Sequence, residues 1–209
     1  MAAPDPLYLL PTPAGAWIAS AEAAADRLRA FIRLLLAQPV SPPWRDPDDL
    51  FVRRLGQLGW VQFLAAPRRV SQAPFDDALR SYLPALSAKG CALLADAHGF
   101  HLASSGFSDS AAEALAALSA DLASLHERHR RSLKHSLGLS GSAWAMPDAA
   151  GHSQLAFWPL HVGEHRFALV TAGVPHLNQP ELVDLVWLLH QRYGPLASRT
   201  QLSVSTTIS

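Results

Sequence analysis

A short apolar hairpin followed at once by a long helix constrains the fold of this chain more than any other stretch. Residues 91–95 are apolar, residues 96–99 read Asp-Ala-His-Gly, and residues 100–104 return as a second strand. Asp at the first position and Gly at the last are typical of a type I turn. Ser108 or Asp109 can cap the helix, which we expect to run to about His135. Such a unit buries its apolar side chains only when the helix packs on the sheet.

The residues around this unit complete an antiparallel sheet. Before it, residues 76–88 have a helical pattern that we expect Pro84 to kink. After it, three further strands are predicted over residues 142–146, 155–162 and 166–172. A last helix follows, capped by Asn178 and ended by Gly194. The predicted order is α-β-β-α-β-β-β-α, an α+β fold with a five-stranded antiparallel sheet and flanking helices.

Two proline-rich breaks, at residues 39–47 and 66–74, divide the chain. We predict three parts from them: an N-terminal region of residues 1–70, a main domain of residues 71–194, and a polar tail of residues 195–209. The tail begins where the last helix is expected to end.

The N-terminal region is predicted to open with a hairpin of residues 7–10 and 16–19. Helices from Ser20 to Gln38 and over residues 48–58 follow, and then a strand over residues 60–64. This order permits a degenerate winged helix. The helix that would read DNA carries two aspartates beside two arginines, so it lacks the basic surface that such binding requires.

The balance of charge also argues against nucleic-acid binding. The chain has 17 basic and 17 acidic residues, and a protein that grips nucleic acid over a long footprint needs an excess of positive charge. Its one cysteine cannot form an internal disulfide, and its longest apolar runs are too short to span a bilayer. The first residues also lack the pattern of a secretory signal. We therefore expect a cytoplasmic protein that binds neither nucleic acid nor membrane.

Residues 90–106 read Gly-Cys-Ala-Leu-Leu-Ala-Asp-Ala-His-Gly-Phe-His-Leu-Ala-Ser-Ser-Gly. This segment resembles the Roadblock / dynein light chain family. The family pattern is an apolar strand, an Asp-x-x-Gly turn, a second strand ending in Ala-Ser, and a loop that contains glycine. An Ala- and Leu-rich helix at residues 111–125 and a late hairpin follow in the family's order, so the resemblance covers about residues 75–192. The N-terminal region has no counterpart in the minimal family domain.

This resemblance implies a non-catalytic regulatory or scaffolding protein with no cofactor. It also implies a homodimer, in which central strands pair into one continuous sheet and the long helices pack side by side. The implied partner is a protein, such as a small GTPase or another NTPase. Because Asp-x-x-Gly hairpins also occur in GAF-type sensor domains, the alternative is a small-molecule sensor with an apolar pocket lined by Trp158 and Phe167.

The long helix itself indicates a partner. Leucines recur along it with 3-4-3 spacing, the pattern of a packed helix pair, at Leu115, Leu118, Leu122 and Leu125. Alanines fill much of its remaining surface, and a helix that is apolar nearly all round is buried on more than one side. These four leucines are the predicted dimer interface. In the alternative arrangement, the N-terminal region supplies the covering helix within the same chain.

The C-terminal half of the long helix carries the sharpest cluster of charge. It can bind an acidic partner or a phosphate through Arg128, Arg130, Arg131 and Lys134, the predicted partner-binding residues. The same residues need no partner if they form a solvated helix end, where the helix dipole favours cations.

No combination of residues indicates catalysis. His126 and His129 lie one helical turn apart, but they lack the His-Glu-x-x-His register of metalloproteases, and the neighbouring arginines repel a cation. The sequence has neither a Gly-x-Ser-x-Gly motif nor a nucleotide-binding Gly-x-x-x-x-Gly-Lys loop. We therefore predict no metal site and no enzymatic activity, with a histidine-based metal enzyme as a further alternative.

Overall fold

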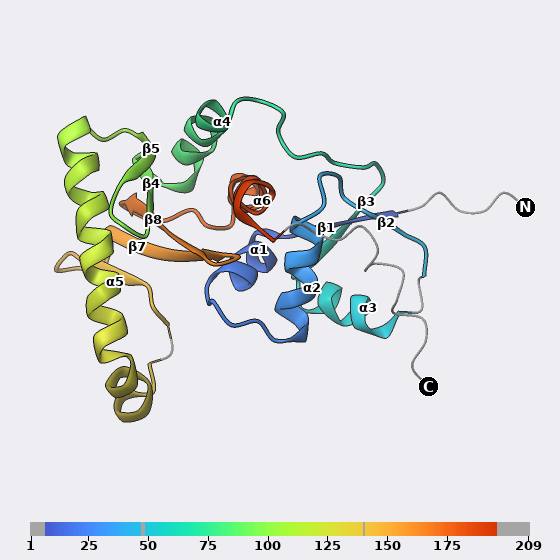
Figure 1. Cartoon of the computed structure of the whole chain (residues 1–209), viewed down its shortest axis with the longest axis horizontal. Coiled ribbons are helices and arrows are strands. Elements are labelled where there is room, and N and C mark those ends of the chain that lie inside the picture. The colour runs from blue at the N-terminus through green and yellow to red at the C-terminus, as the bar shows by residue number, and fades with distance from the viewer. Residues whose placement is uncertain (1–6, 47–48, 140, 196–209) are drawn as a thin grey trace, which may run out of the picture.

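The computed structural model describes residues 7–46, 49–139 and 141–195 (Figure 1). Its elements are β1 (Leu7–Pro11), α1 (Pro13–Ser20), α2 (Arg27–Leu36), β2 (Pro43–Trp44), α3 (Leu50–Gln57), β3 (Val61–Leu64), α4 (Phe75–Tyr82), the 3-10 helix η1 (Leu83–Leu86), β4 (Ala92–Asp96), β5 (His101–Ser105), α5 (Asp109–Leu137), β6 (Trp144–Pro147), β7 (Ser153–Val162), β8 (His165–Ala172) and α6 (Pro180–Tyr193). Of the predicted tail, residues 196–209 lie outside the described residues.

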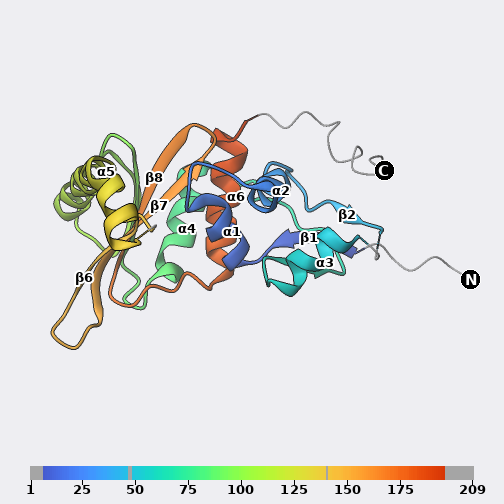
Figure 2. The ribbon, with the colours of Figure 1, turned by 90° about the horizontal axis from the view of Figure 1, so that it is seen from below.

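The main sheet has five strands in the order β5-β4-β8-β7-β6, and every neighbouring pair is antiparallel. The α+β class, the element order of the main region and the five-stranded sheet are therefore confirmed. Helix α5 lies on one face of this sheet, and α4 and α6 lie on the other (Figures 1 and 2).

The turn between β4 and β5 is held by the carboxylate of Asp96. Its Oδ1 accepts hydrogen bonds from the backbone N–H of His98 at 2.9 Å and of Phe100 at 3.0 Å. Gly99 completes the turn with a φ of +87°, a conformation that strains any residue with a Cβ. A Cβ at Gly99 would also lie 3.1 Å from Ala117 Cα, so the turn packs directly against α5.

Side chains of the sheet alternate between two cores. On β4, Leu93 and Ala95 belong to the smaller core beneath α5, whereas Ala92 and Leu94 belong to the larger core on the other face. The alternation follows from the two-residue period of a strand. Residues 92–95 of β4 are therefore all apolar, because both faces of the strand are covered.

The ends of the helices in the main region agree with their local signals except at the start of α6. Ser108 caps α5 by accepting a hydrogen bond from the N–H of Ala111, and Gly138 ends it in a left-handed conformation. The expected break at Pro84 is present, because α4 gives way to η1 there. Asn178 does not cap α6, however. Since Pro180 takes the first helical position, Gln179 is the cap residue, and its side chain makes no capping bond.

The predicted hairpin of residues 7–10 and 16–19 is wrong, because the second of these segments is helical. Thr12 caps α1 by accepting a hydrogen bond from the N–H of Gly15 at 3.1 Å, and Pro13 occupies the first turn. Strand β1 instead pairs with β2 and β3 in a separate three-stranded antiparallel sheet.

The single helix predicted from Ser20 to Gln38 is also wrong at its start. Ser20 is the last residue of α1, and its hydroxyl donates to the carbonyl of Ala16 at 2.7 Å. Helix α2 begins only after Asp26, whose carboxylate accepts a hydrogen bond from the N–H of Arg29 at 2.9 Å. The end of α1 and the whole of α2 therefore lie where one helix was expected.

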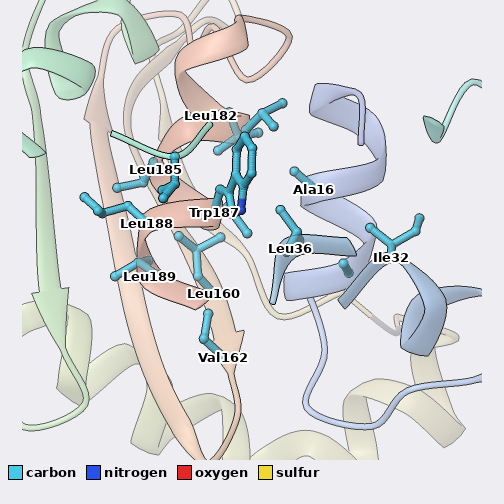
Figure 3. Close-up of a cluster of buried hydrophobic side chains, with 14 of the residues drawn as sticks. Ala16, Ile32, Leu36, Leu160, Val162, Leu182, Leu185, Trp187, Leu188 and Leu189 are labelled. Atoms are coloured by element: carbon cyan, nitrogen blue, oxygen red, sulfur yellow. The ribbon is translucent and has the colours of Figure 1, made fainter. Parts of the chain in front are cut away.

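One hydrophobic core joins the N-terminal elements to the main sheet. Trp187 of α6 is 1% exposed, and it lies beside Ala16 of α1 and Leu36 of α2 (Figure 3). Its indole N–H donates to the carbonyl of Gln38 at 2.7 Å. The division at about residue 70 thus stays a prediction from the sequence, and the core crosses it.

Candidate protein interface

Helix α5 covers one face of the main sheet and turns the rest of its surface outward (Figure 2). Its buried residues, Ala112, Ala116 and Ser119, recur every three or four positions and therefore share one face. Among the described residues, α1, α2 and α3 lie on the opposite side of the sheet from α5 (Figure 1). This placement excludes the alternative in which one of those helices covers α5.

The four leucines of the predicted dimer interface do not all face the same way. Leu115 and Leu122 pack against the small core between α5 and the sheet, which includes Phe157. Leu118 and Leu125 are each 38% exposed. The outward apolar surface of α5 is therefore carried by Leu118 and Leu125, and the other two leucines lie at its border.

Among the described strands, β6 lies at one edge of the sheet, next to α5 (Figure 2). Trp144 of this strand packs against the core beneath α5, and its ring lies edge-on to His126, with 6.3 Å between centroids. Met146 on the same strand is 57% exposed. Because β4, β8 and β7 each have two neighbours, a second copy could extend the sheet only at an edge strand.

The structure brings together two of the four predicted partner-binding residues. Arg130 and Lys134 line a groove of about 420 Å³, whereas Arg128 and Arg131 do not. Arg130 Nε donates to the Glu127 carboxylate at 3.1 Å on the helix surface. An exposed pair of this kind adds little to stability.

The opposite wall of the groove comes from elements far away in the chain. His161 of β7 and Arg166 of β8 are direct partners across the β7–β8 hairpin, and both line the groove. The loop between α1 and α2 closes a further side with residues 21–24. Sequence reasoning missed Arg166, because nothing local marks it, and it reaches α5 only through the pairing of the sheet.

Positive charge dominates the electrostatics of this groove. Burial lowers the pKa of His161, the charges of Arg166 and Arg33 lower that pKa further, and Glu22 acts in the opposite direction. An imidazole with a pKa below its ordinary value of 6.5 is neutral at pH 7. The guanidinium groups therefore hold most of the charge, and the imidazole is a neutral hydrogen-bonding group.

The residues proposed for a sensor pocket lie apart. Phe167 lines a second cavity of about 290 Å³ between the β4–β5 and β7–β8 turns, but Trp158 lines neither this cavity nor the groove. The Trp158 ring packs edge-on against Trp17, with 5.7 Å between centroids, and its N–H donates to Thr171 Oγ1 at 3.1 Å. The small-molecule sensor alternative therefore finds no support in this part of the fold.

The paired histidines of α5 differ in their surroundings. His126 faces Trp144, whereas His129 is exposed. Within the described ranges, no group of three or more His, Cys, Asp or Glu side chains could hold a metal ion. Over the same residues, no helix combines the length and apolar character needed to cross a membrane.

The order and packing of the elements in the main region define its fold. A helix precedes the β4–β5 hairpin, α5 crosses one face of the sheet, three antiparallel strands follow, and α6 covers the other face. The hairpin is closed by the Asp-x-x-Gly turn on which the sequence resemblance rests. The fold is Roadblock-like.

Solved structures similar to this Roadblock-like chain include three from bacteria. A Roadblock/LC7 domain from Streptomyces avermitilis is 17% identical, with a TM-score of 0.41, and the match covers 57% of this chain and 98% of that one. MglB from Myxococcus xanthus is 16% identical, with a TM-score of 0.37, over 64% of this chain and 99% of that one. The gliding protein MglB from Thermus thermophilus is 20% identical, with a TM-score of 0.36, over 59% and 93%. No family model and no curated protein matches the chain.

Proposed function

We propose that this Roadblock-like protein is a non-catalytic regulatory or scaffolding protein that acts as a homodimer and binds a protein partner. The observation that carries the proposal is the outward apolar surface of α5, formed by Leu118 and Leu125, next to the free edge of β6. Apolar area left in water costs about 25 cal/mol per Å². A second copy recovers that free energy with the same surface, as two-fold symmetric dimers do.

The spacing of these leucines suits a pair of helices. Leu118 and Leu125 are seven residues apart, and a seven-residue repeat keeps side chains on one seam of a packed helix pair. Ala114, an exposed small residue four positions before Leu118, lets a second helix approach closely. Strand β6 gives such a dimer a second contact, because its unpaired edge can join the same edge of another copy.

The partner in this proposal is a small GTPase or another NTPase, the partner class that the family resemblance implies. It would contact the basic cluster of α5, through Arg128, Arg130, Arg131 and Lys134, with an acidic surface of its own. Affinity capture from the native cell with mass spectrometry identifies this partner. In this proposal, the protein changes the activity of its partner by binding to it, without catalysing a reaction.

The substitution Leu118→Arg tests the dimer. A charged side chain in the centre of an apolar helix pair loses its hydration without gaining a partner. Sedimentation velocity is expected to give a dimer for the wild-type protein and a monomer for the variant. The matched control is Ser124→Arg, which adds the same charge to an exposed position of α5 away from the leucine seam. An unchanged mass for Leu118→Arg, or a wild-type monomer, would contradict the proposed dimer.

A further inference from the structure

We propose that the groove between α5 and the β7–β8 hairpin is a binding site for a small anion that carries phosphate groups. Cationic side chains enter this groove from two walls, Arg130 and Lys134 from α5 and Arg166 from β8. His126 and His161 add ring nitrogens to the same lining. This inference goes beyond the proposed protein partner, since it assigns a small-molecule site that lies within one copy of the chain.

The acidic residues of the lining already have partners. Glu127 is paired with Arg130, as described above, and the Glu22 carboxylate lies 3.4 Å from Arg29 at the start of α2. Neither Lys134 nor Arg166 forms an ion pair in the described part of the chain. The groove therefore keeps two cations that no carboxylate of the described residues neutralises.

The loop that closes the groove is held in place before any ligand binds. The guanidinium of Arg33 on α2 donates to the carbonyls of Ala19 at 2.7 Å and Ala23 at 3.0 Å, and also to the carbonyl of Glu22. These bonds tie the α1–α2 loop to a helix. A pre-organised wall lowers the entropy that the protein loses when a ligand binds.

The size and lining of the groove indicate more than a single inorganic ion. Its volume of about 420 Å³ lies within the roughly 300–1,000 Å³ of typical small-molecule sites. Apolar side chains, including Ala123, Leu139 and Pro159, line the rest of the surface and can contact an organic group. Arg and Lys together favour phosphate, because the guanidinium binds two oxygens at once and the ammonium adds a point charge.

Pyrophosphate is the probe for the test, titrated into the full-length protein by calorimetry at low ionic strength. We expect saturable binding with one site per chain. Arg166→Ala is expected to weaken it by about tenfold or more, the loss typical of one charge-assisted hydrogen bond. Lys134→Ala, at an exposed position, is a second variant that does not threaten the fold. The matched control is Arg53→Ala on α3, which removes an arginine from a remote exposed surface and should leave the affinity unchanged.

His161 gives an independent signal. A bound anion favours the charged imidazolium, so pyrophosphate should raise the pKa of His161 against the lowering by Arg166 and Arg33. Nuclear magnetic resonance of the histidine rings, titrated with and without pyrophosphate, measures this change. The opposing charge of Glu22 is present in both titrations and cancels from the difference.

The outcomes separate this site from the proposed dimer. Citrate replaces pyrophosphate in a parallel titration, and equal affinity for the two would overturn the assignment to phosphate. The absence of saturable binding, or equal affinity in wild type, Arg166→Ala and Lys134→Ala, would overturn the site itself. Sedimentation of Arg166→Ala is expected to match the wild type, so a failed anion site leaves the dimer proposal intact, and a failed dimer leaves the anion site intact.

Discussion

Single residues set several features of this fold through hydrogen bonds that span only a few positions. Asp96 closes the β4–β5 turn, and Asp49 caps α3 by accepting hydrogen bonds from the N–H groups of Phe51 and Val52. Asp49 thus has a structural role in α3, the helix that would read DNA in a winged helix. Such signals can be predicted from sequence, because a carboxylate two to four residues before its donors needs no other part of the chain.

His190 has the opposite character, because its properties depend on the whole core. It is 3% exposed on α6, and its Nε2 has no hydrogen-bond partner among the described residues. Burial, and then the positive charge of Arg33, lower its pKa from 6.5 to about 4. No local feature of the sequence predicts this value, since both causes come from packing.

The first prediction follows from His190. Its pKa is lower in the folded chain than in the unfolded chain, so the unfolded state binds more protons between about pH 4 and pH 6.5. The stability that neutral His190 contributes is fully present above pH 6.5 and is lost as the pH falls towards 4, by an amount on the order of 3 kcal/mol. His161 changes in the same direction.

Urea denaturation at a series of pH values across this range measures the effect. The free energy of unfolding is expected to fall with decreasing pH in the wild-type protein. His190→Gln removes the titrating group while keeping a polar side chain, and it should flatten this dependence whatever its stability near neutral pH. Identical slopes for the two proteins would show that His190 is not the cause.

At the scale of elements, helix α1 is the clearest failure of sequence reasoning. Thr12 and Pro13 are an N-cap and a first-turn proline, so the local signal for a helix was present. The apolar residues after Gly15 favoured a strand instead. A tertiary contact explains the glycine at position 15, because a Cβ there would lie 1.9 Å from the carbonyl oxygen of Trp60. The helix is thus seated against the chain just before β3, a contact that no local pattern reveals.

The turn at Gly99 packs directly against α5, so a side chain at this position should destabilise the fold. Gly99→Ala places a Cβ at a φ of +87° and 3.1 Å from the backbone of α5. Gly151→Ala is a matched control, because its φ is +84° and nothing lies within 4 Å of its Cβ. We expect both variants to lose about 1–2 kcal/mol from backbone strain. Gly99→Ala should lose more, since α5 must also shift away from the turn.

Thermal and urea unfolding of the two glycine variants measure this difference. An equal loss of stability in both would mean that the turn does not press against α5. A larger loss in Gly151→Ala would contradict the packing described for Gly99.

At the scale of the whole molecule, the N-terminal region and the main sheet share one core and polar contacts across it. Arg68, near the end of the N-terminal region, lies 2.6 Å from the Asp184 carboxylate of α6. Gln191 of α6 donates to the carbonyl of Leu36 at 2.8 Å. Burial raises the pKa of Asp184, and the charge and hydrogen bond of Arg68 act against that rise. Helix α6 is therefore covered on two sides.

The shared core predicts that the two regions unfold together. Trp187→Ala removes the largest fully buried side chain and is expected to cost about 3–5 kcal/mol, whereas Trp187→Phe should cost less because it leaves a smaller cavity. Circular dichroism and tryptophan fluorescence should follow one transition in the wild type and in both variants. Separate transitions by the two probes would instead contradict unfolding in a single step.

The sequence by itself determined the order of elements between residues 75 and 193, the Asp96 turn and the ends of α5. Each depends on caps, turn residues or hydrophobic periodicity, which act over a few neighbouring positions. The sequence could not show which of Leu115 and Leu118 faces the sheet. Around the helix axis, the directions of the two side chains lie less than a quarter of a turn apart. Only the position of the sheet decides which of them is buried.

Tertiary structure alone also decided that Arg166 and Lys134 line one groove, and that α6 packs against both the main sheet and α2. These features join residues far apart in the chain, and their formation depends on how faces pack after the elements exist. The physical reason is that hydrogen bonds of caps and turns are local, whereas burial is shared by the whole molecule. A sequence pattern can show that a surface is apolar, but the fold determines whether it faces the core or a partner.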